Sequence, residues 1–135
     1  MTAMATAAAL CVGDVMTTRL VTVRPADSLL SAWELMARGD IHHLPVAVGR
    51  RCVSLLDDRI VAAALARPFA PPRRLVSEVM PARVHCVLAD TELRRAAAIM
   101  AAERATALPV VDEEMSLVGL VTDRDIVRVI AGGLG

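Results

Sequence analysis

The sequence lacks several residue types on which common protein functions depend. Of its 135 residues only one is Trp and one is Phe, and neither Tyr nor Lys occurs. Proteins that bind nucleic acid by stacking need aromatic rings, and this chain has almost none to offer. Its fifteen basic residues, all Arg, are balanced by fifteen acidic residues, so no net positive charge attracts a phosphate backbone. We therefore expect no nucleic-acid partner.

Cysteine and long apolar runs are also scarce. Cys11, Cys52 and Cys86 are odd in number, far apart and without CxxC spacing, which argues against a disulfide framework and for a reducing compartment. No apolar stretch reaches the roughly 20 residues that span a bilayer. Residues 1–11 are apolar but carry no basic segment, so we interpret them as a tail and not as a signal peptide. The sequence predicts a soluble, cytoplasmic protein with no membrane partner.

Motifs that would indicate catalysis or metal binding are missing. The histidines His42, His43 and His85 and the cysteines show no spacing typical of a zinc site. His85 and Cys86 are adjacent on an expected strand, so their side chains would point to opposite faces and form no nucleophile pair. There is no G-x-S-x-G motif and no P-loop. We expect no enzymatic activity, no bound metal and no cofactor.

What the chain does contain is an internal repeat. Matching apolar segments recur in the same order about 64 residues apart, with one extra residue in the last turn of the second copy. The pairs are 12–23 with 76–87, 29–36 with 93–100, 44–46 with 108–110, and 53–59 with 118–124. An ordered recurrence over more than fifty residues indicates two copies of one structural unit.

The repeat sets the predicted domain organisation. We expect an N-terminal tail at 1–11, a first repeat at 12–66, a linker at 67–75, a second repeat at 76–131 and a C-terminal tail at 132–135. The linker contains Pro68, Pro71 and Pro72, which cannot continue a helix and stiffen the connection.

Each copy is predicted to run strand, helix, strand, strand, helix. Short strands are expected at 21–23 and 85–87. An amphipathic helix is expected over 27–39, where Asp27 and Ser28 give a cap signal at its start and Gly39 ends it, and its counterpart begins at 93. Two strands then form a hairpin, and helices over 57–66 and 122–131 close the copies. The apolar residues of the first helix and its counterpart fall at i, i+3, i+4 and i+7, which predicts one buried face: Leu29, Ala32, Trp33 and Met36, and Leu93, Ala96, Ala97 and Met100.

These elements predict a fold that combines helices and strands, of the α/β class and, more narrowly, of the α+β type. A unit of about 55–60 residues has only a marginal core by itself. We therefore expect the two βαββα units to pack sheet to sheet with pseudo-two-fold symmetry, leaving a cleft between the copies. Such clefts commonly bind small ligands. Met16, Met36, Met80 and Met100 recur at matching positions and are interpreted as core residues.

The segments "DVMTTRLVTV", "IHHLPV", "EVMPARVHCV" and "LPVVDEEMSLVGLVTDRDIV" give the chain its resemblance to a known family. Over roughly residues 12–131 it resembles a tandem pair of CBS domains, the regulatory module named after cystathionine β-synthase. The resemblance implies a βαββα unit and a stand-alone two-repeat module. It also implies an adenosine-containing ligand in the cleft (AMP, ADP, ATP or S-adenosylmethionine), a regulated partner protein and a flat homodimer.

Thr122 and Asp125 have two possible roles. By spacing alone they form a capping box, with Thr122 at the N-cap and Asp125 at N3. The same helix start could hold a ligand, since free amides bind phosphate and a carboxylate accepts hydrogen bonds from ribose hydroxyls. In the family, a Gly, then Thr or Ser, then Asp three residues later binds adenosine, and Gly119, Thr122 and Asp125 match this motif. Both roles can hold together.

The first copy provides an internal comparison. There the aligned residues are Ser54, Asp57 and Ile60. Asp57 can still cap a helix, but Ile60 cannot accept a hydrogen bond from ribose, and Asp57 would repel phosphate. We predict one competent nucleoside site per chain.

The resemblance also assigns the opposite wall of the site. Residues before the "LPV" strand of the partner repeat contact the phosphate in the family, and here these are Ile41, His42 and His43. A protonated histidine binds phosphate more strongly. The backbone near Val21 is expected at the adenine edge, and Arg124 either faces the phosphate or is simply solvated.

Two other functions stay open from the sequence. The chain could be a structural or dimerisation module with a degenerate site, or a metal- or redox-responsive module that uses its His and Cys residues. The Ala- and Met-rich helix faces at 91–102 and 122–131 favour self-association, and we expect a homodimer.

Overall fold

The computed structural model describes residues 10–68 and 74–132, which divide into two compact units. Unit 1 contains residues 10–19 and 85–132, and unit 2 contains 20–68 and 74–84. The units therefore do not coincide with the sequence repeats. The first segment of each repeat packs with the remainder of the other repeat.

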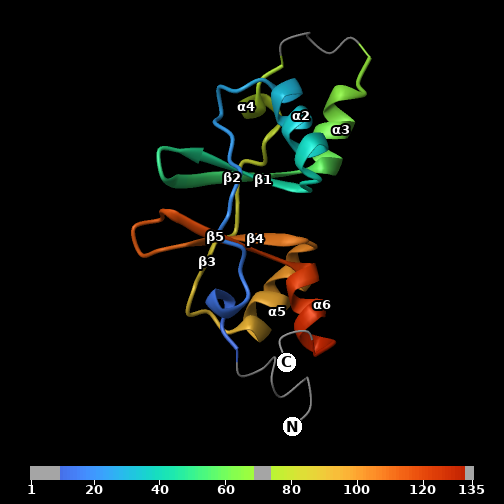
Figure 1. Cartoon of the computed structure of the whole chain (residues 1–135). Helices are drawn as coiled ribbons and strands as arrows, with labels where there is room; N and C mark the ends of the chain where they lie inside the picture. The colour runs from blue at the N-terminus through green and yellow to red at the C-terminus, as the bar shows by residue number, and fades with distance from the viewer. Residues whose placement is uncertain (1–9, 69–73, 133–135) are drawn as a thin grey trace. The chain divides into compact units, whose positions relative to one another are not determined.

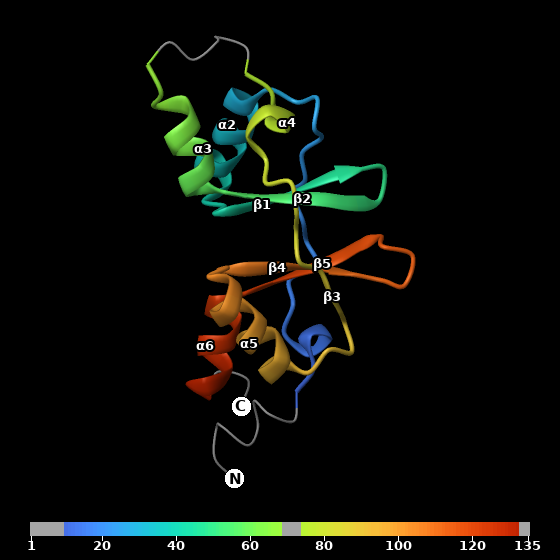
Figure 2. The ribbon, with the colours of Figure 1, turned by 180° about the vertical axis from the view of Figure 1, so that it is seen from behind.

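Unit 2 is a β-hairpin covered by helices. Its strands β1 (His43–Val48) and β2 (Arg51–Asp57) pair antiparallel, as predicted. Its helices are α2 (Leu29–Gly39), α3 (Asp58–Leu65) and the short α4 (Val76–Val79). Figures 1 and 2 show all three helices on the same face of the hairpin.

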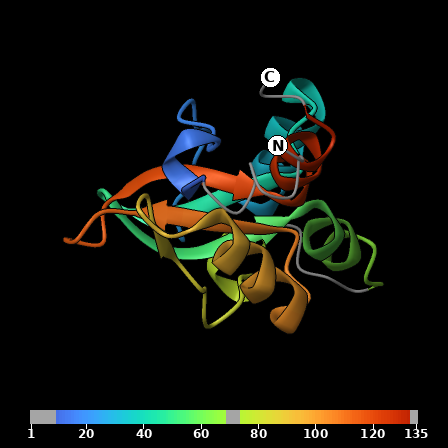
Figure 3. The same ribbon diagram turned by 90° about the horizontal axis from the view of Figure 1, so that it is seen from below.

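Unit 1 repeats this plan around a three-stranded sheet. The strand order is β3 (Val87–Leu88), β4 (Ala107–Val111) and β5 (Leu117–Thr122), with β3 parallel and β5 antiparallel to β4. The helices are η1 (Val12–Asp14), α5 (Leu93–Glu103) and α6 (Asp123–Ile130). They too lie on one face of their sheet (Figures 1 and 3). The mixed α/β class, with two sheets, is confirmed.

The first strands of the repeats are shorter than predicted. The strand expected at 21–23 is a single parallel bridge from Val23 to Val46, and the strand expected at 85–87 begins only at Val87. Two short helical turns, η1 and α4, were not expected from the sequence. Each has an acidic side chain that accepts from the backbone at its own start: Asp14 from the Cys11 amide at 2.9 Å and Glu78 from the Leu75 amide at 2.8 Å.

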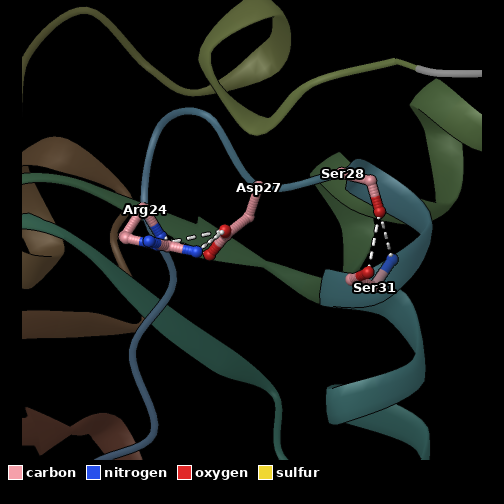
Figure 4. A network of polar contacts seen from close by, with 4 residues as sticks. All are labelled: Arg24, Asp27, Ser28 and Ser31. Carbon is pink, nitrogen blue, oxygen red and sulfur yellow. Dashed lines mark hydrogen bonds and ion pairs between the residues drawn. The ribbon is translucent and has the colours of Figure 1, made fainter.

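Helix α2 begins where the sequence places its cap. Ser28 accepts a hydrogen bond from the Ser31 amide at 3.0 Å (Figure 4). The preceding turn is closed by Asp27, which accepts from the Arg24 amide at 2.7 Å and from its guanidinium at 3.0 Å. The backbone N–H of Arg24 lowers the pKa of Asp27, and the guanidinium lowers it further. The helix ends at Gly39, and its C-cap Asp40 has a left-handed backbone with φ of 50°.

The buried helix faces confirm most of the predicted core, with Trp33 as the correction. Leu29, Ala32 and Met36 are buried, but Trp33 is 38% exposed. At about 100° per residue, Trp33 lies about 40° beyond Leu29, on the side away from Ala32 and Met36. It therefore sits at the edge of the buried stripe.

The counterpart helix shows the same pattern. Leu93, Ala96 and Met100 are buried, and Ala97 is half-buried. The predicted methionine role is confirmed, since Met36 and Met100 are buried and Met16 and Met80 pack against the two cores. Parts of the predicted tails and linker (1–9, 69–73 and 133–135) lie outside the described residues.

Candidate functional site

The junction of β5 and α6 in unit 1 holds Thr122 and Asp125 together. Thr122 Oγ1 accepts from the Asp125 amide at 3.3 Å, and Asp125 Oδ2 accepts from the Thr122 amide at 2.8 Å. The predicted capping box is therefore confirmed. Asp125 is 6% exposed, which is unusual for a carboxylate. Its Oδ1 atom lies 3.6 Å from Arg128 Nη1, beyond ordinary hydrogen-bond distance.

Gly119 has a structural reason to be a glycine. The chain at Met16 and Thr17 crosses β5 closely, and Thr17 exchanges two backbone hydrogen bonds with Leu120, at 2.9 and 3.0 Å. A Cβ on Gly119 would lie 2.5 Å from Met16 Sδ and 3.2 Å from the Thr17 carbonyl oxygen. The motif glycine thus lets the crossing segment approach the strand that leads to Thr122.

The corresponding junction in unit 2 uses different residues for the same structural tasks. Asp57 caps α3 by accepting from the Ile60 amide at 2.8 Å, which confirms its predicted role. Ser54, at the position of Gly119, is fully buried and donates to the Pro81 carbonyl at 2.8 Å. Pro81 aligns with Thr17 but has no N–H to donate. The serine hydroxyl therefore supplies a hydrogen bond to the crossing segment here.

His42 is held by carboxylates of its own unit. Its Nδ1 lies 3.0 Å from Asp58 Oδ2, and its Nε2 lies 3.7 Å from Asp40 Oδ1. The His42 side chain is 51% exposed. The hydrogen bond from His42 lowers the pKa of Asp58, and the nearby charges of His42 and His43 lower it further. The Asp58 amide also donates to the His42 carbonyl at 3.1 Å, so α3 is tied to His42 twice.

The other predicted site residues lie in different surroundings. His43 opens β1, opposite Asp57 in the register, and is half-buried. Ile41 packs against the core of unit 2, and its amide donates to the Met36 carbonyl at 2.9 Å. Val21 is 39% exposed and precedes the bridge at Val23, and Arg124 is exposed in the first turn of α6. The structure thus joins Thr122 to Asp125 and places His42 and His43 near Asp58.

The contacts that sequence reasoning missed connect residues far apart in the chain. His42 and Asp58 are 16 residues apart, and Ser54 and Pro81 are 27 apart. Neither pair has a local pattern that would reveal it. The crossing of β5 by Thr17, and with it the matching position of Pro81 in the repeat alignment, is known only from the structure.

The chemistry of the remaining His and Cys residues gives no further site. Within residues 10–68 and 74–132, no cluster of three or more His, Cys, Asp or Glu side chains is arranged to hold a metal ion. Cys11, Cys52 and Cys86 form no disulfide. His85, which precedes β3, forms an ion pair with Glu103.

Among the described helices, none is both long and apolar enough to cross a bilayer.

Comparison with known proteins now identifies the family. The sequence profile of the CBS domain matches residues 12–67 and 76–132. The helix, hairpin and helix that recur in each repeat, together with these two matches, define a pair of CBS domains. The chain belongs to the CBS domain family, as the resemblance implied.

Solved structures of CBS domain pairs share this fold. The CBS domain pair of protein MJ0100, in complex with 5′-methylthioadenosine and S-adenosyl-L-methionine, has a TM-score of 0.82 at 26% identity, covering 91% of this chain and 97% of that one. CBSX2 in complex with AMP also has a TM-score of 0.82 at 26% identity, covering 93% and 99%. The cytosolic domain of the Mg²⁺ channel MgtE in complex with ATP has a TM-score of 0.75 at 32% identity, covering 88% and 48%.

Curated relatives are much longer than the matched region. The inosine-5′-monophosphate dehydrogenase of Methanocaldococcus jannaschii is 33% identical over 110 residues, which is 81% of this chain and 21% of the relative. The homoserine O-acetyltransferase of Methanocorpusculum labreanum is 30% identical over 115 residues, 85% and 23%. The chain therefore spans about a fifth of the length of these relatives.

Proposed function

We propose that this chain is a regulatory module that binds an adenosine-containing ligand and thereby alters the behaviour of a partner protein. Membership of the CBS domain family supports this function, as do three similar structures solved with adenosine compounds. A ligand can change the conformation only if it binds two states with different affinity. The partner would bind the ligand-bound conformation and the ligand-free conformation differently.

The observation that carries the proposal is the geometry of Asp125. Its carboxylate is buried and fixed, because Oδ2 accepts from the Thr122 amide. Oδ1 lies 3.6 Å from Arg128, which leaves it able to accept a shorter hydrogen bond. A fixed carboxylate acceptor suits the paired hydroxyls of a ribose. Capping and ribose binding can therefore be performed by the same side chain.

The remaining contacts of the proposed site follow from the family resemblance. Thr122 and Arg124 would lie beside Asp125, Val21 would meet adenine, and Ile41, His42 and His43 would line the 5′ side of the ligand. The first-copy residues Ser54, Asp57 and Ile60 offer no equivalent acceptor, since Ile60 replaces Asp125. One nucleoside per chain is proposed.

The test compares two helix caps, only one of which is proposed to bind ribose. Asp57→Ala removes the N-cap of α3, and Asp125→Ala removes the N3 half of the capping box of α6. Each should cost about 1 kcal/mol of stability. Ligand at about 100 times its dissociation constant should stabilise the wild type by roughly 2.7 kcal/mol. Thermal unfolding is measured for each protein with and without AMP, ADP, ATP and S-adenosylmethionine, and the ligand-induced shift is compared within each variant.

The proposal expects a ligand-induced shift in the wild type and in Asp57→Ala, and none in Asp125→Ala. An equal shift in all three proteins would remove Asp125 from the site. No shift with any ligand, in a folded preparation free of bound nucleotide, would favour a structural or dimerisation module instead.

Self-association and location are part of the same proposal. Helix α6 exposes Val127 (63%) and Ile130 (45%), and α5 exposes Ala98, Ala101 and Ala102. Met100 adds nothing to this face because it is buried. We propose a homodimer, and sedimentation equilibrium giving the mass of one chain would contradict it. The lack of a disulfide at Cys11, Cys52 and Cys86 agrees with a cytoplasmic location.

A further inference from the structure

The zero net charge of the chain conceals opposite charges on its two units. Residues 20–84, to which unit 2 belongs, contain nine Arg and six acidic residues, a formal net charge of +3. Residues 1–19 and 85–135, to which unit 1 belongs, contain six Arg and nine acidic residues, a formal net charge of −3. Unit 1 of one copy therefore attracts unit 2 of another copy, over a range of roughly 8 Å at physiological ionic strength.

The negative charge of unit 1 gathers at a groove, called the acidic groove below. The groove has a volume of about 590 Å³ and is formed by β3, the turn that follows it and the β4–β5 hairpin. Its lining residues are all apolar or acidic, and among them are Leu88, Val118, Asp90, Asp112, Glu113 and Glu114. Leu88 is 40% exposed and offers apolar surface to an occupant.

The carboxylates of the acidic groove are not neutralised by basic side chains. Asp112 is fixed by its own turn, since its Oδ1 accepts from the amides of Glu114 and Ser116, each at 2.9 Å. Asp90, Glu113 and Glu114 are exposed, and none of them forms an ion pair with another described residue. The groove therefore favours an occupant that combines positive charge with apolar surface.

The equivalent turn of unit 2 carries the opposite charge. In the repeat, residues 47–52 correspond to 111–117, and here only Gly49 and Arg50 separate β1 from β2. Gly49 has a φ of 61°, which suits the first central position of a two-residue hairpin turn. Figure 1 shows this turn extending beyond the helices of its unit.

The side chains at this turn, called the basic tip below, match the acidic groove. Arg50 and Arg51 are exposed, and neither forms an ion pair within the part of the chain that the structure describes. Val48 is 58% exposed and lies directly opposite Arg51 in the register, so the two side chains share a face of the hairpin. The basic tip thus combines two guanidinium groups with an apolar side chain on a short turn.

We infer that the acidic groove of unit 1 binds the basic tip of a second copy of this chain. Guanidinium groups pair with carboxylates through parallel hydrogen bonds, and Val48 would pack against the apolar part of the groove. Each copy carries one groove and one tip, so the contact is heterologous and either closes into a ring or extends with concentration. It is separate from the helix faces of α5 and α6 and does not depend on adenosine binding.

Sedimentation velocity of the whole chain over a range of concentrations measures this self-association. EDTA is present so that no divalent cation occupies the carboxylates. Raising the ionic strength from 0.1 M to 1 M shortens the screening length from about 10 Å to about 3 Å. We expect the association constant to fall at least tenfold over this range, because the attraction is between charges at the surface.

Charge reversal identifies the two surfaces. Arg50→Glu/Arg51→Glu and Glu113→Arg/Glu114→Arg should each weaken self-association at least tenfold at 0.1 M, because each brings like charges together. The chain with all four substitutions has the charges exchanged and should associate within threefold of the wild type. All four side chains are exposed, and circular dichroism checks that each variant is folded.

The matched control is Arg38→Glu/Arg59→Glu. It changes the net charge of unit 2 by the same amount as the tip variant, at two exposed arginines on α2 and α3. It should leave self-association within threefold of the wild type, because neither arginine belongs to the basic tip.

The possible outcomes separate this contact from other forms of self-association. Equal weakening by the control and the tip variant would show that only the net charge of the unit acts, and would overturn the inference. Groove reversal that weakens association while tip reversal does not would show that the groove has a different occupant. Reversals without effect, or no recovery in the fourfold variant, would also overturn the contact and leave the homodimer proposed above in place. A wild type that stays monomeric would contradict both.

Discussion

Replacing Gly119 by alanine tests the close crossing that supports the candidate site. The new Cβ would lie 2.5 Å from Met16 Sδ, 3.1 Å from Met16 Cγ and 3.2 Å from the Thr17 carbonyl oxygen. Met16 can change its side-chain conformation, but Thr17 is held by two backbone hydrogen bonds to Leu120. The strain should therefore be divided between a side chain that can move and a backbone that cannot.

The size of the effect follows from these contacts. Overpacking a well-packed site costs about 1–3 kcal/mol, and we expect about 2 kcal/mol for Gly119→Ala. Met16→Ala alone should cost about 1–2 kcal/mol, less than the roughly 2–5 kcal/mol of a fully buried residue, because Met16 is only half-buried. In the double variant the sulfur contact is gone. Its cost should therefore be at least about 1 kcal/mol smaller than the sum of the single costs.

Urea denaturation of the four proteins measures this coupling, with unfolding free energies from linear extrapolation. Far-UV circular dichroism is the suitable probe, because the single tryptophan, Trp33, lies in unit 2 while Gly119 and Met16 lie in unit 1. Additive costs within about 0.5 kcal/mol would falsify the reasoning. A neutral Gly119→Ala would show that the crossing segment yields without cost.

Two further predictions concern unit 2. Ser54→Ala should lower the free energy of unfolding by about 1–2 kcal/mol, because the Pro81 carbonyl loses a partly buried hydrogen bond, and an unchanged urea midpoint would contradict this. Asp27 has a lowered pKa in the folded state, so its stabilising effect is complete above the ordinary value of 3.8 and is lost as the pH falls through the folded pKa. Asp27→Asn should therefore have a lower free energy of unfolding than the wild type at neutral pH. Below about pH 4 its free energy of unfolding should change less with pH. Wild-type and variant curves that run parallel below about pH 4 would refute this.

The helices and hairpins could be predicted from local signals. Ser28 caps α2 where the sequence places a cap, and the buried residues Leu29 and Met36 follow the 3.6-residue period. The apolar runs at 44–48 and 52–56 became an antiparallel hairpin. Trp33 was misassigned because a residue at the edge of a helical stripe satisfies the same spacing as one at its centre.

The candidate site could be predicted only in part. Thr122 and Asp125 are three residues apart, so their capping geometry is local and readable. The carboxylates of Asp40 and Asp58 around His42 could not be foreseen as a group, because Asp58 reaches His42 only after β1 and β2 have paired.

The sequence by itself determined the repeat, the order of helix, hairpin and helix in each copy and the residues able to cap a helix, because these depend on spacings of a few residues. Tertiary structure decided which segments share a core. Residues 10–19 pack with 85–132, and 74–84 pack with 20–68. The two copies carry matching apolar first segments, so either segment could in principle complete either sheet. Only long-range pairing, such as Thr17 with Leu120 in unit 1, selects between them.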